Sequence, residues 1–171
     1  MIQREAYLQQ LINFKDIKLI KIITGIRRCG KSTLFDIYID YLKSQNIGKE
    51  QIIQVNLENP DMKFNDYMEL YNYIKEKMIK DKMNYIFIDE VQNVPNFQKA
   101  VDGLFIKENA DIYITGSNAY LLSGELATLL SGRYIEIKML PLSFKEYLSA
   151  FDSKIDKNEK LLEYFKYGAL P

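Results

Sequence analysis

The stretch Gly25-Ile26-Arg27-Arg28-Cys29-Gly30-Lys31-Ser32, followed by Thr33, decides the fold. It fits the pattern G-x-x-x-x-G-K-[ST], the Walker A or phosphate-binding loop (P-loop). The two fixed glycines allow main-chain N–H groups to turn inward around a phosphate. A helix expected to start near Lys31 directs its N-terminal N–H groups at the same place. We therefore expect residues 25–33 to bind a nucleotide, with Lys31 on the β- and γ-phosphates and the Ser32 hydroxyl on Mg²⁺.

Strand and helix patterns alternate on both sides of this loop. Strands are predicted at residues 18–24, 51–57, 84–89, 111–116 and 134–138, and helices at 3–13, 31–44, 66–80, 96–105, 119–131 and 158–167, with a capping box at Ser143-Phe144-Lys145-Glu146. Five alternations predict an α/β fold, a parallel sheet with helices on both faces. Near Pro141 the alternation gives way to helices, so we place a core at residues 1–140 and a helical tail at 141–171.

Composition excludes several classes of function. The 23 Lys+Arg balance the 23 Asp+Glu, which argues against a dedicated nucleic-acid-binding domain. There is no histidine, so His-based metal sites and His general bases are excluded. The one cysteine, Cys29, rules out an internal disulfide. No apolar run approaches the roughly 18 residues that span a bilayer, and no signal-peptide pattern is present. We expect a cytoplasmic protein with no membrane partner.

Two adjacent acids, Asp89 and Glu90, end the third predicted strand. Ligands of open α/β sheets bind at the carboxyl ends of the strands, so this position suits a Walker B site. Asp89 is expected to hold Mg²⁺ together with Ser32. Glu90 is the candidate to deprotonate the attacking water, because the chain has no histidine for that task. This order of acids indicates the ATPase branch of P-loop proteins; the alternative is a strand end capped by two solvated acids.

Residues that follow the fourth strand and the 119–131 segment are further candidates for the nucleotide site. Ser117 or Asn118 would lie beside the γ-phosphate and distinguish ATP from ADP; turn formation and helix capping suit them equally. Arg133 is either a guanidinium for the γ-phosphate or a structural ion pair at the sheet edge. Cys29 is better explained as a small side chain packed under the loop than as an activated thiol. Arg27 and Arg28 suit phosphate, a partner or solvent.

Taken together, these motifs resemble a family of prokaryotic AAA+-type P-loop ATPases with a G-x-R-R-x-G-K-[ST] loop and a C-terminal domain of unknown function. The matching segments are residues 25–32, Asn56-Leu57-Glu58, Ile88-Asp89-Glu90-Val91-Gln92, Ile114-Thr115-Gly116-Ser117-Asn118, Ser131-Gly132-Arg133-Tyr134 and Pro141-Leu142-Ser143-Phe144. The resemblance implies a three-layer P-loop NTPase fold, a five-stranded sheet of order 5-1-4-3-2, ATP and Mg²⁺ as ligands, and a longer parent protein. It also implies an arginine finger at Arg133. No arginine follows Arg133, so the chain has no sensor-2 arginine of its own.

The sequence suggests three functions that a P-loop protein of this kind could have. The leading hypothesis is Mg²⁺-dependent ATP hydrolysis that drives or switches a C-terminal domain or partner. The alternative is an ATP-binding switch with negligible turnover in isolation, whose missing arginine comes from self-association or from the C-terminal domain. A small-molecule kinase is disfavoured because its mobile lid needs arginines that the tail lacks. The expected partner is ATP, and nucleic acid is not indicated.

Overall fold

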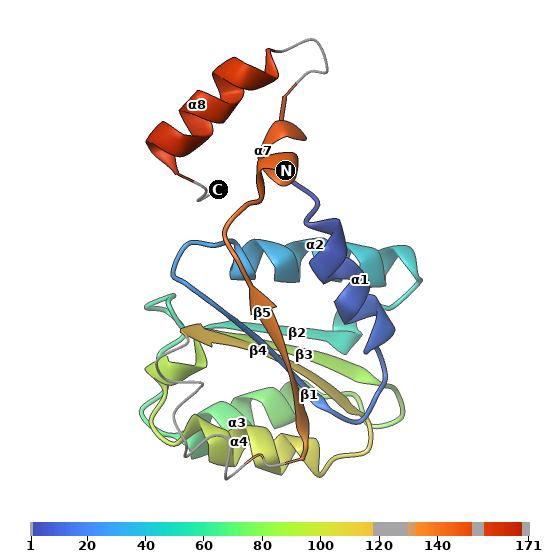
Figure 1. The fold of residues 1–171 in the computed structure, drawn as a ribbon. Helices are drawn as coiled ribbons and strands as arrows, with labels where there is room; N and C mark the ends of the chain where they lie inside the picture. The colour runs from blue at the N-terminus through green and yellow to red at the C-terminus, as the bar shows by residue number, and fades with distance from the viewer. Residues whose placement is uncertain (1, 118–129, 131, 152–155, 169–171) are drawn as a thin grey trace.

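Five parallel strands form one sheet at the centre of the molecule. The computed structural model describes residues 2–117, 130, 132–151 and 156–168. The strands are β1 (Ile20–Gly25), β2 (Ile52–Asn56), β3 (Asn84–Asp89), β4 (Ala110–Ser117) and β5 (Tyr134–Met139). Their order across the sheet is β2-β3-β4-β1-β5, with every neighbouring pair parallel (Figure 1). The predicted order 5-1-4-3-2 and the P-loop NTPase fold are therefore confirmed.

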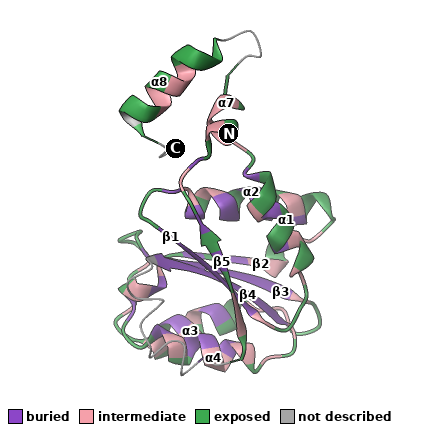
Figure 2. Cartoon of the chain, viewed as in Figure 1, coloured by how far each residue is buried: buried purple, intermediate pink, exposed green. Residues whose placement is uncertain are grey.

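Helices cover both faces of this sheet and bury it. On one face lie α1 (Glu5–Asn13) and α2 (Lys31–Ser44), and on the other lie α3 (Tyr67–Lys77) and α4 (Phe97–Phe105) (Figure 1). Two apolar clusters fill the two interfaces, and β1 and β3 are buried along their whole length (Figure 2). Strands that are covered on both faces explain the nearly continuous apolar runs in the sequence.

The strand register brings the carboxyl ends of all five strands to one edge of the sheet. Gly25, the last residue of β1, is paired with Ser117 of β4 and with Met139 of β5. Asp89, the last residue of β3, is paired with Asn56 at the end of β2. The loop that follows β1 and the acids that end β3 therefore emerge at the same edge, where ligands of such sheets bind.

Two helices differ by two or more residues from their predicted bounds, for reasons that lie in the tertiary structure. The helix expected from residue 3 begins at Glu5, because Arg4 adopts a left-handed conformation with φ 49°. The helix expected at 66–80 ends at Lys77, because Met78 is extended and the next residue is held by the buried side chain of Asn84. Most of the helix expected at 119–131 lies outside the described residues.

A short helical tail follows β5 and extends beyond the layers of the core (Figure 1). It contains α7 (Phe144–Leu148) and α8 (Lys157–Tyr167). The capping box that opens α7 is confirmed: Ser143 Oγ accepts the Glu146 N–H at 3.3 Å, and Glu146 Oε2 accepts the Ser143 N–H at 2.8 Å. The division into a 1–140 core and a 141–171 tail stays a prediction. No helix in the described ranges combines the length and apolar character that crossing a bilayer requires.

Candidate functional site: the loop after β1

The loop between β1 and α2 has a conformation that its sequence requires. Gly30 has φ 95°, a left-handed value that favours glycine, and Arg28 shares this region with φ 65°. Gly25 is needed for a different reason. A Cβ there would lie 2.6 Å from the carbonyl oxygen of Met139 and 2.7 Å from Cys29 Sγ. The loop is therefore packed closely against β5 while its main chain curves back into α2.

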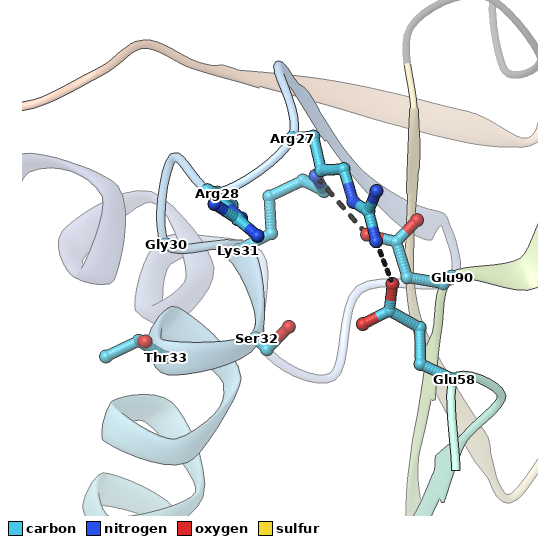
Figure 3. A pocket seen from close by; sticks show the side chains of 8 residues that line it. All are labelled: Arg27, Arg28, Gly30, Lys31, Ser32, Thr33, Glu58 and Glu90. Atoms are coloured by element: carbon cyan, nitrogen blue, oxygen red, sulfur yellow. Dashed lines mark hydrogen bonds and ion pairs between the residues drawn. The ribbon is translucent and has the colours of Figure 1, made fainter. Parts of the chain in front are cut away.

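A cavity of about 480 Å³ lies against this loop (Figure 3). Its walls come from the loop, from the first turn of α2, and from the residues that follow β2 and β3. The lining residues are Arg27, Arg28, Gly30, Lys31, Ser32, Thr33, Glu58 and Glu90. The first N–H groups of a helix have no partner within the helix, so the start of α2 gives this cavity a positive wall suited to phosphate oxygens.

Lys31 is the buried cation of the cavity, with 4% of its surface exposed. Its Nζ lies 3.5 Å from the Gly25 carbonyl oxygen, 3.4 Å from the Ile26 carbonyl oxygen and 3.5 Å from Glu90 Oε1. Figure 3 shows the ammonium lying between the loop and Glu90. All three contacts are long for an ammonium, whose charge-assisted bonds are normally about 2.7–2.9 Å. The donors of Lys31 are therefore only weakly satisfied, which suits a cation that binds an anion.

Glu90 is held in position at both its main chain and its side chain. It adopts a left-handed conformation with φ 55°, which is uncommon for a residue other than glycine. Its N–H donates to Thr115 Oγ1 at 2.9 Å, and its Oε2 accepts from Gln92 Nε2 at 2.5 Å. The other carboxylate oxygen is thus left to face Lys31.

A second, smaller cavity of about 110 Å³ adjoins the first and is lined by both predicted metal ligands, Ser32 and Asp89. Asp36, one turn further along α2, lines it as well. Burial, reinforced by the charges of Asp40 and Asp89, raises the pKa of Asp36 above its ordinary value. Hydroxyl and carboxylate oxygens are ligands that Mg²⁺ prefers, so this donor set fits a divalent cation.

An exposed ion pair crosses the opening of the larger cavity. Arg27 Nη2 lies 3.5 Å from Glu58 Oε1, and their side chains are 80% and 53% exposed (Figure 3). Exposed pairs of this kind contribute about 0–1 kcal/mol, so the pair separates easily. Cys29, by contrast, is fully buried beneath the loop, and burial raises the pKa of its thiol. Its environment is that of the packed side chain favoured from the sequence.

Arg133 lies at the opposite edge of the sheet from the cavity. Its Nη1 pairs with Asp102 Oδ1 at 2.5 Å, and its guanidinium carbon lies 6.0 Å from the centre of the Phe105 ring. Its carbonyl oxygen accepts the N–H of Ile20, the first residue of β1. The six residues of β1 separate that position from the loop by about 20 Å, at 3.3 Å per residue. The structural ion pair, which the sequence analysis gave as one of two alternatives for Arg133, is therefore present. Arg133 does not line the cavity of its own chain.

The remaining predicted residues are only partly described. Ser117 is the last residue of β4 and is paired with Gly25. Asn118 lies outside the described residues. Sequence reasoning assigned no role to Thr115, Gln92 or Glu58, although each stands within a segment that carries the family resemblance. Thr115 contacts Asp89 and Glu90 across two strands, Glu58 pairs with Arg27 of the loop, and Gln92 donates to Glu90 two residues before it.

Comparisons with known proteins agree with this fold. A family model described as "AAA domain" matches residues 18–148. An uncharacterized protein of Haemophilus influenzae is 51% identical over 178 residues, covering 100% of this chain and 44% of that protein. An uncharacterized protein of Methanocaldococcus jannaschii is 35% identical over 175 residues, covering 91% of this chain and 37% of that protein. The chain thus spans less than half the length of these relatives.

Solved structures with the same fold include Cdc6 and ORC1 proteins. Cdc6p from Pyrobaculum aerophilum aligns with a TM-score of 0.60 and 13% identity, over 96% of this chain and 50% of that one. The Aeropyrum pernix ORC1 protein, solved in complex with DNA, aligns with a TM-score of 0.57 and 12% identity, over 94% and 50%. At these identities the likeness establishes the fold alone.

Proposed function

Because this chain belongs to the AAA domain family, we propose that it binds ATP together with Mg²⁺ and hydrolyses ATP to ADP and phosphate. One observation carries the proposal. A buried lysine and a serine at the start of α2 meet two acids from the end of β3 around two adjoining cavities. This combination at the carboxyl edge of a parallel sheet suits a triphosphate and a divalent cation.

Each residue of the site has a distinct task in this proposal. Main-chain N–H groups of residues 25–33 surround the phosphates, and Lys31 binds phosphate oxygens through its ammonium. Ser32 and Asp89 hold the cation. When bound, Mg²⁺ supplies positive charge that neutralises the phosphate oxygens. Glu90 orients the attacking water and accepts its proton.

Roles are also proposed for Ser117, Asn118 and Arg133, in addition to the described residues that line the two cavities. Ser117 ends β4 and is paired with Gly25 at the start of the loop, which suits a group that distinguishes ATP from ADP; the same role is proposed for Asn118 from the sequence alone. Arg133 is about half exposed and lies far from its own cavity, so a finger role would require a second copy or another domain. In the longer relatives, hydrolysis would drive or switch the remainder of the protein or a partner. We also propose a cytoplasmic location.

A second candidate function is an ATP-dependent switch with negligible turnover. The observation that favours it is the pairing of Arg133 with Asp102, which keeps this guanidinium away from the cavity of its own chain. An arginine on the γ-phosphate can contribute about 10³–10⁵ in rate, so its absence would leave binding intact and turnover slow. The two candidates share the same site and differ in phosphate release.

The proposal is tested by replacing Glu90 with glutamine, which keeps the shape of the side chain and removes its basicity. We expect Glu90→Gln to lower Mg²⁺-dependent phosphate release by about 10²–10⁴-fold while ATP affinity stays near that of the wild type. Glu76→Gln is the matched control, because Glu76 is exposed on α3 and the chemical change is the same. Normal hydrolysis by Glu90→Gln would show that the base has been misassigned.

Thermal unfolding separates the two candidate functions. Binding of Mg²⁺ and ATP at 100 times Kd would stabilise the protein by about 2.7 kcal/mol. Stabilisation with phosphate release that rises with protein concentration supports an ATPase assembled from several copies. Stabilisation without phosphate release at any concentration supports the switch. The absence of both thermal stabilisation and heat of binding would contradict nucleotide binding itself.

A further inference from the structure

A buried hydroxyl connects the two acids at the end of β3. Thr115 lies in β4, directly beside the end of β3, and its side chain is fully buried. Its Oγ1 donates a hydrogen bond to Asp89 Oδ1 and accepts one from the main-chain N–H of Glu90 at 2.9 Å. One atom therefore contacts both a proposed metal ligand and the main chain of the proposed base.

The position of this hydroxyl follows from the way the two strands separate. The β3–β4 ladder ends at the pair Ile88–Ile114. Beyond it, the chain turns at Glu90 with φ 55°, so the Glu90 N–H points away from a regular strand partner. A main-chain N–H that is removed from water without a hydrogen-bond partner destabilises the fold. The Thr115 hydroxyl supplies that partner and so stabilises the turn that presents the Glu90 side chain to Lys31.

The same hydroxyl fixes the direction of the Asp89 carboxylate. Thr115 occupies Oδ1, and none of the described residues hydrogen-bonds Oδ2. Asp89 is 93% buried and lines the smaller cavity together with Ser32. Because Thr115 hydrogen-bonds Asp89 Oδ1, Asp89 Oδ2 is available to a cation in that cavity. Groups that hold metal ligands in this way typically change metal affinity or activity by about 10–100-fold.

We propose that Thr115 is a positioning residue that couples the metal-binding and water-activating acids through a single hydroxyl. This inference rests on the proposed function, because it assigns Asp89 to the cation and Glu90 to the water. A hydroxyl is needed because it donates one hydrogen bond and accepts another at once. Valine has nearly the same shape but neither capacity, and serine keeps both while losing only a methyl group.

The test compares Thr115→Val with Thr115→Ser in the full chain. ATP binding is measured by calorimetry in excess Mg²⁺ and in excess EDTA, and phosphate release by steady-state kinetics. We expect Thr115→Val to lose most of the Mg²⁺-dependent gain in ATP affinity and to leave the affinity in EDTA unchanged. Its kcat should fall by about 10–100-fold with a smaller change in KM. Thr115→Ser should retain both properties.

A purely structural role predicts a different result. It would lower the melting temperature of Thr115→Val but leave the Mg²⁺-dependent gain and kcat as in the wild type, and that outcome overturns the inference. If Thr115→Val does not fold, Thr115→Ala is compared with Thr115→Ser, since these two differ only in the hydroxyl; equal behaviour of the two again overturns it.

The wild type decides the proposed function separately from the variants. Failure of the wild type to bind ATP under either condition would reject the proposed function. Normal Mg²⁺-dependent binding and turnover in the wild type, shared by a folded Thr115→Val, would reject only the role of Thr115. Binding without turnover in the wild type leaves the Mg²⁺-dependent gain as the deciding measurement.

Discussion

Lys21 and Asp111 form a buried ion pair in the part of the sheet farthest from the phosphate loop. Lys21 on β1 is fully buried, and its Nζ contacts Asp111 Oδ1 and donates to the Ile17 carbonyl oxygen at 2.6 Å. Asp111 Oδ2 accepts from the Asp16 N–H at 2.9 Å and from the Tyr113 hydroxyl at 2.7 Å. Burial lowers the pKa of Lys21 despite the attraction of Asp111. Each charge therefore depends on the other.

Removing one charge of this pair should destabilise the fold strongly. We expect Lys21→Met to lower the free energy of unfolding by about 3–5 kcal/mol, because it leaves Asp111 buried and unpaired. Adding Asp111→Asn should recover much of this loss, since a neutral amide oxygen still accepts hydrogen bonds. Urea unfolding followed by circular dichroism measures both, as the chain has no tryptophan.

The matched control is Lys43→Met, which removes a lysine from an exposed ion pair with Asp40. Its effect should stay below about 1 kcal/mol. A double variant as unstable as Lys21→Met alone would mean that lost packing, and not an unpaired charge, causes the destabilisation.

At the scale of elements, the loop between α3 and β3 is organised by one buried amide. The Asn84 side chain is fully buried; its Oδ1 accepts the Ile79 N–H at 2.8 Å, and its Nδ2 donates to the carbonyl oxygens of Ile79 and Lys82, both at 2.9 Å. Nδ2 also lies 3.1 Å from the carbonyl oxygen of Asn109, the residue before β4. This amide therefore ends α3 and aligns the starts of β3 and β4.

We expect Asn84→Ala to lower the free energy of unfolding by about 2–3 kcal/mol, because it leaves buried main-chain groups of the 78–83 loop without partners. Hydrogen exchange in that loop should accelerate at the same time. Asn72→Ala, on an exposed position of α3, is the control and should change stability by about 0.5 kcal/mol or less, since alanine favours helices. Equal losses in the two variants would contradict a special role for Asn84.

The strands were predicted from sequence to within two residues at each end, and helix bounds less well. Buried parallel strands leave continuous apolar runs, as at residues 84–89, and such runs are local signals. The end of α3 depends on Asn84, seven residues beyond Lys77. The helical periodicity of the sequence carries no sign of this contact, so the predicted helix was too long. The start of α1 depends on Arg4, whose partners lie far along the chain.

At the scale of the whole molecule, some residues of the candidate site could be predicted from the sequence and others could not. Lys31, Ser32, Asp89 and Glu90 were found from motifs, because the P-loop pattern and the order of strands bring them to one edge. Thr115 was not, because its role depends on contacts across β3 and β4 that only the folded sheet creates.

One side chain near the N-terminus connects the loop with the tail. Arg4 is buried, and its Nη1 donates to the Cys29 carbonyl oxygen at 3.3 Å, while its Nη2 donates to the Leu140 carbonyl oxygen at 2.6 Å. Its Nε lies 3.0 Å from Glu146 Oε1 of α7, an ion pair without hydrogen-bond geometry. A planar guanidinium can reach three such groups at once, whereas an ammonium cannot hold the same geometry.

We expect Arg4→Ala to accelerate hydrogen exchange in residues 26–31 and 143–149 together, and to lower the free energy of unfolding by about 1.5–3 kcal/mol. Arg4→Lys should rescue this only partly. Lys80→Ala, at an exposed position between α3 and β3, is the control and should affect neither segment. Faster exchange in only one of the two segments would show that Arg4 does not connect them.

The double contact of Arg4 ties together two main-chain positions that are more than a hundred residues apart along the chain. Since one rigid planar group holds both carbonyls, a shift of the backbone at Cys29 requires a matching shift at Leu140 or the rupture of a bond. The distance between the carbonyl oxygens of Cys29 and Leu140 therefore reports on the positions of both segments together.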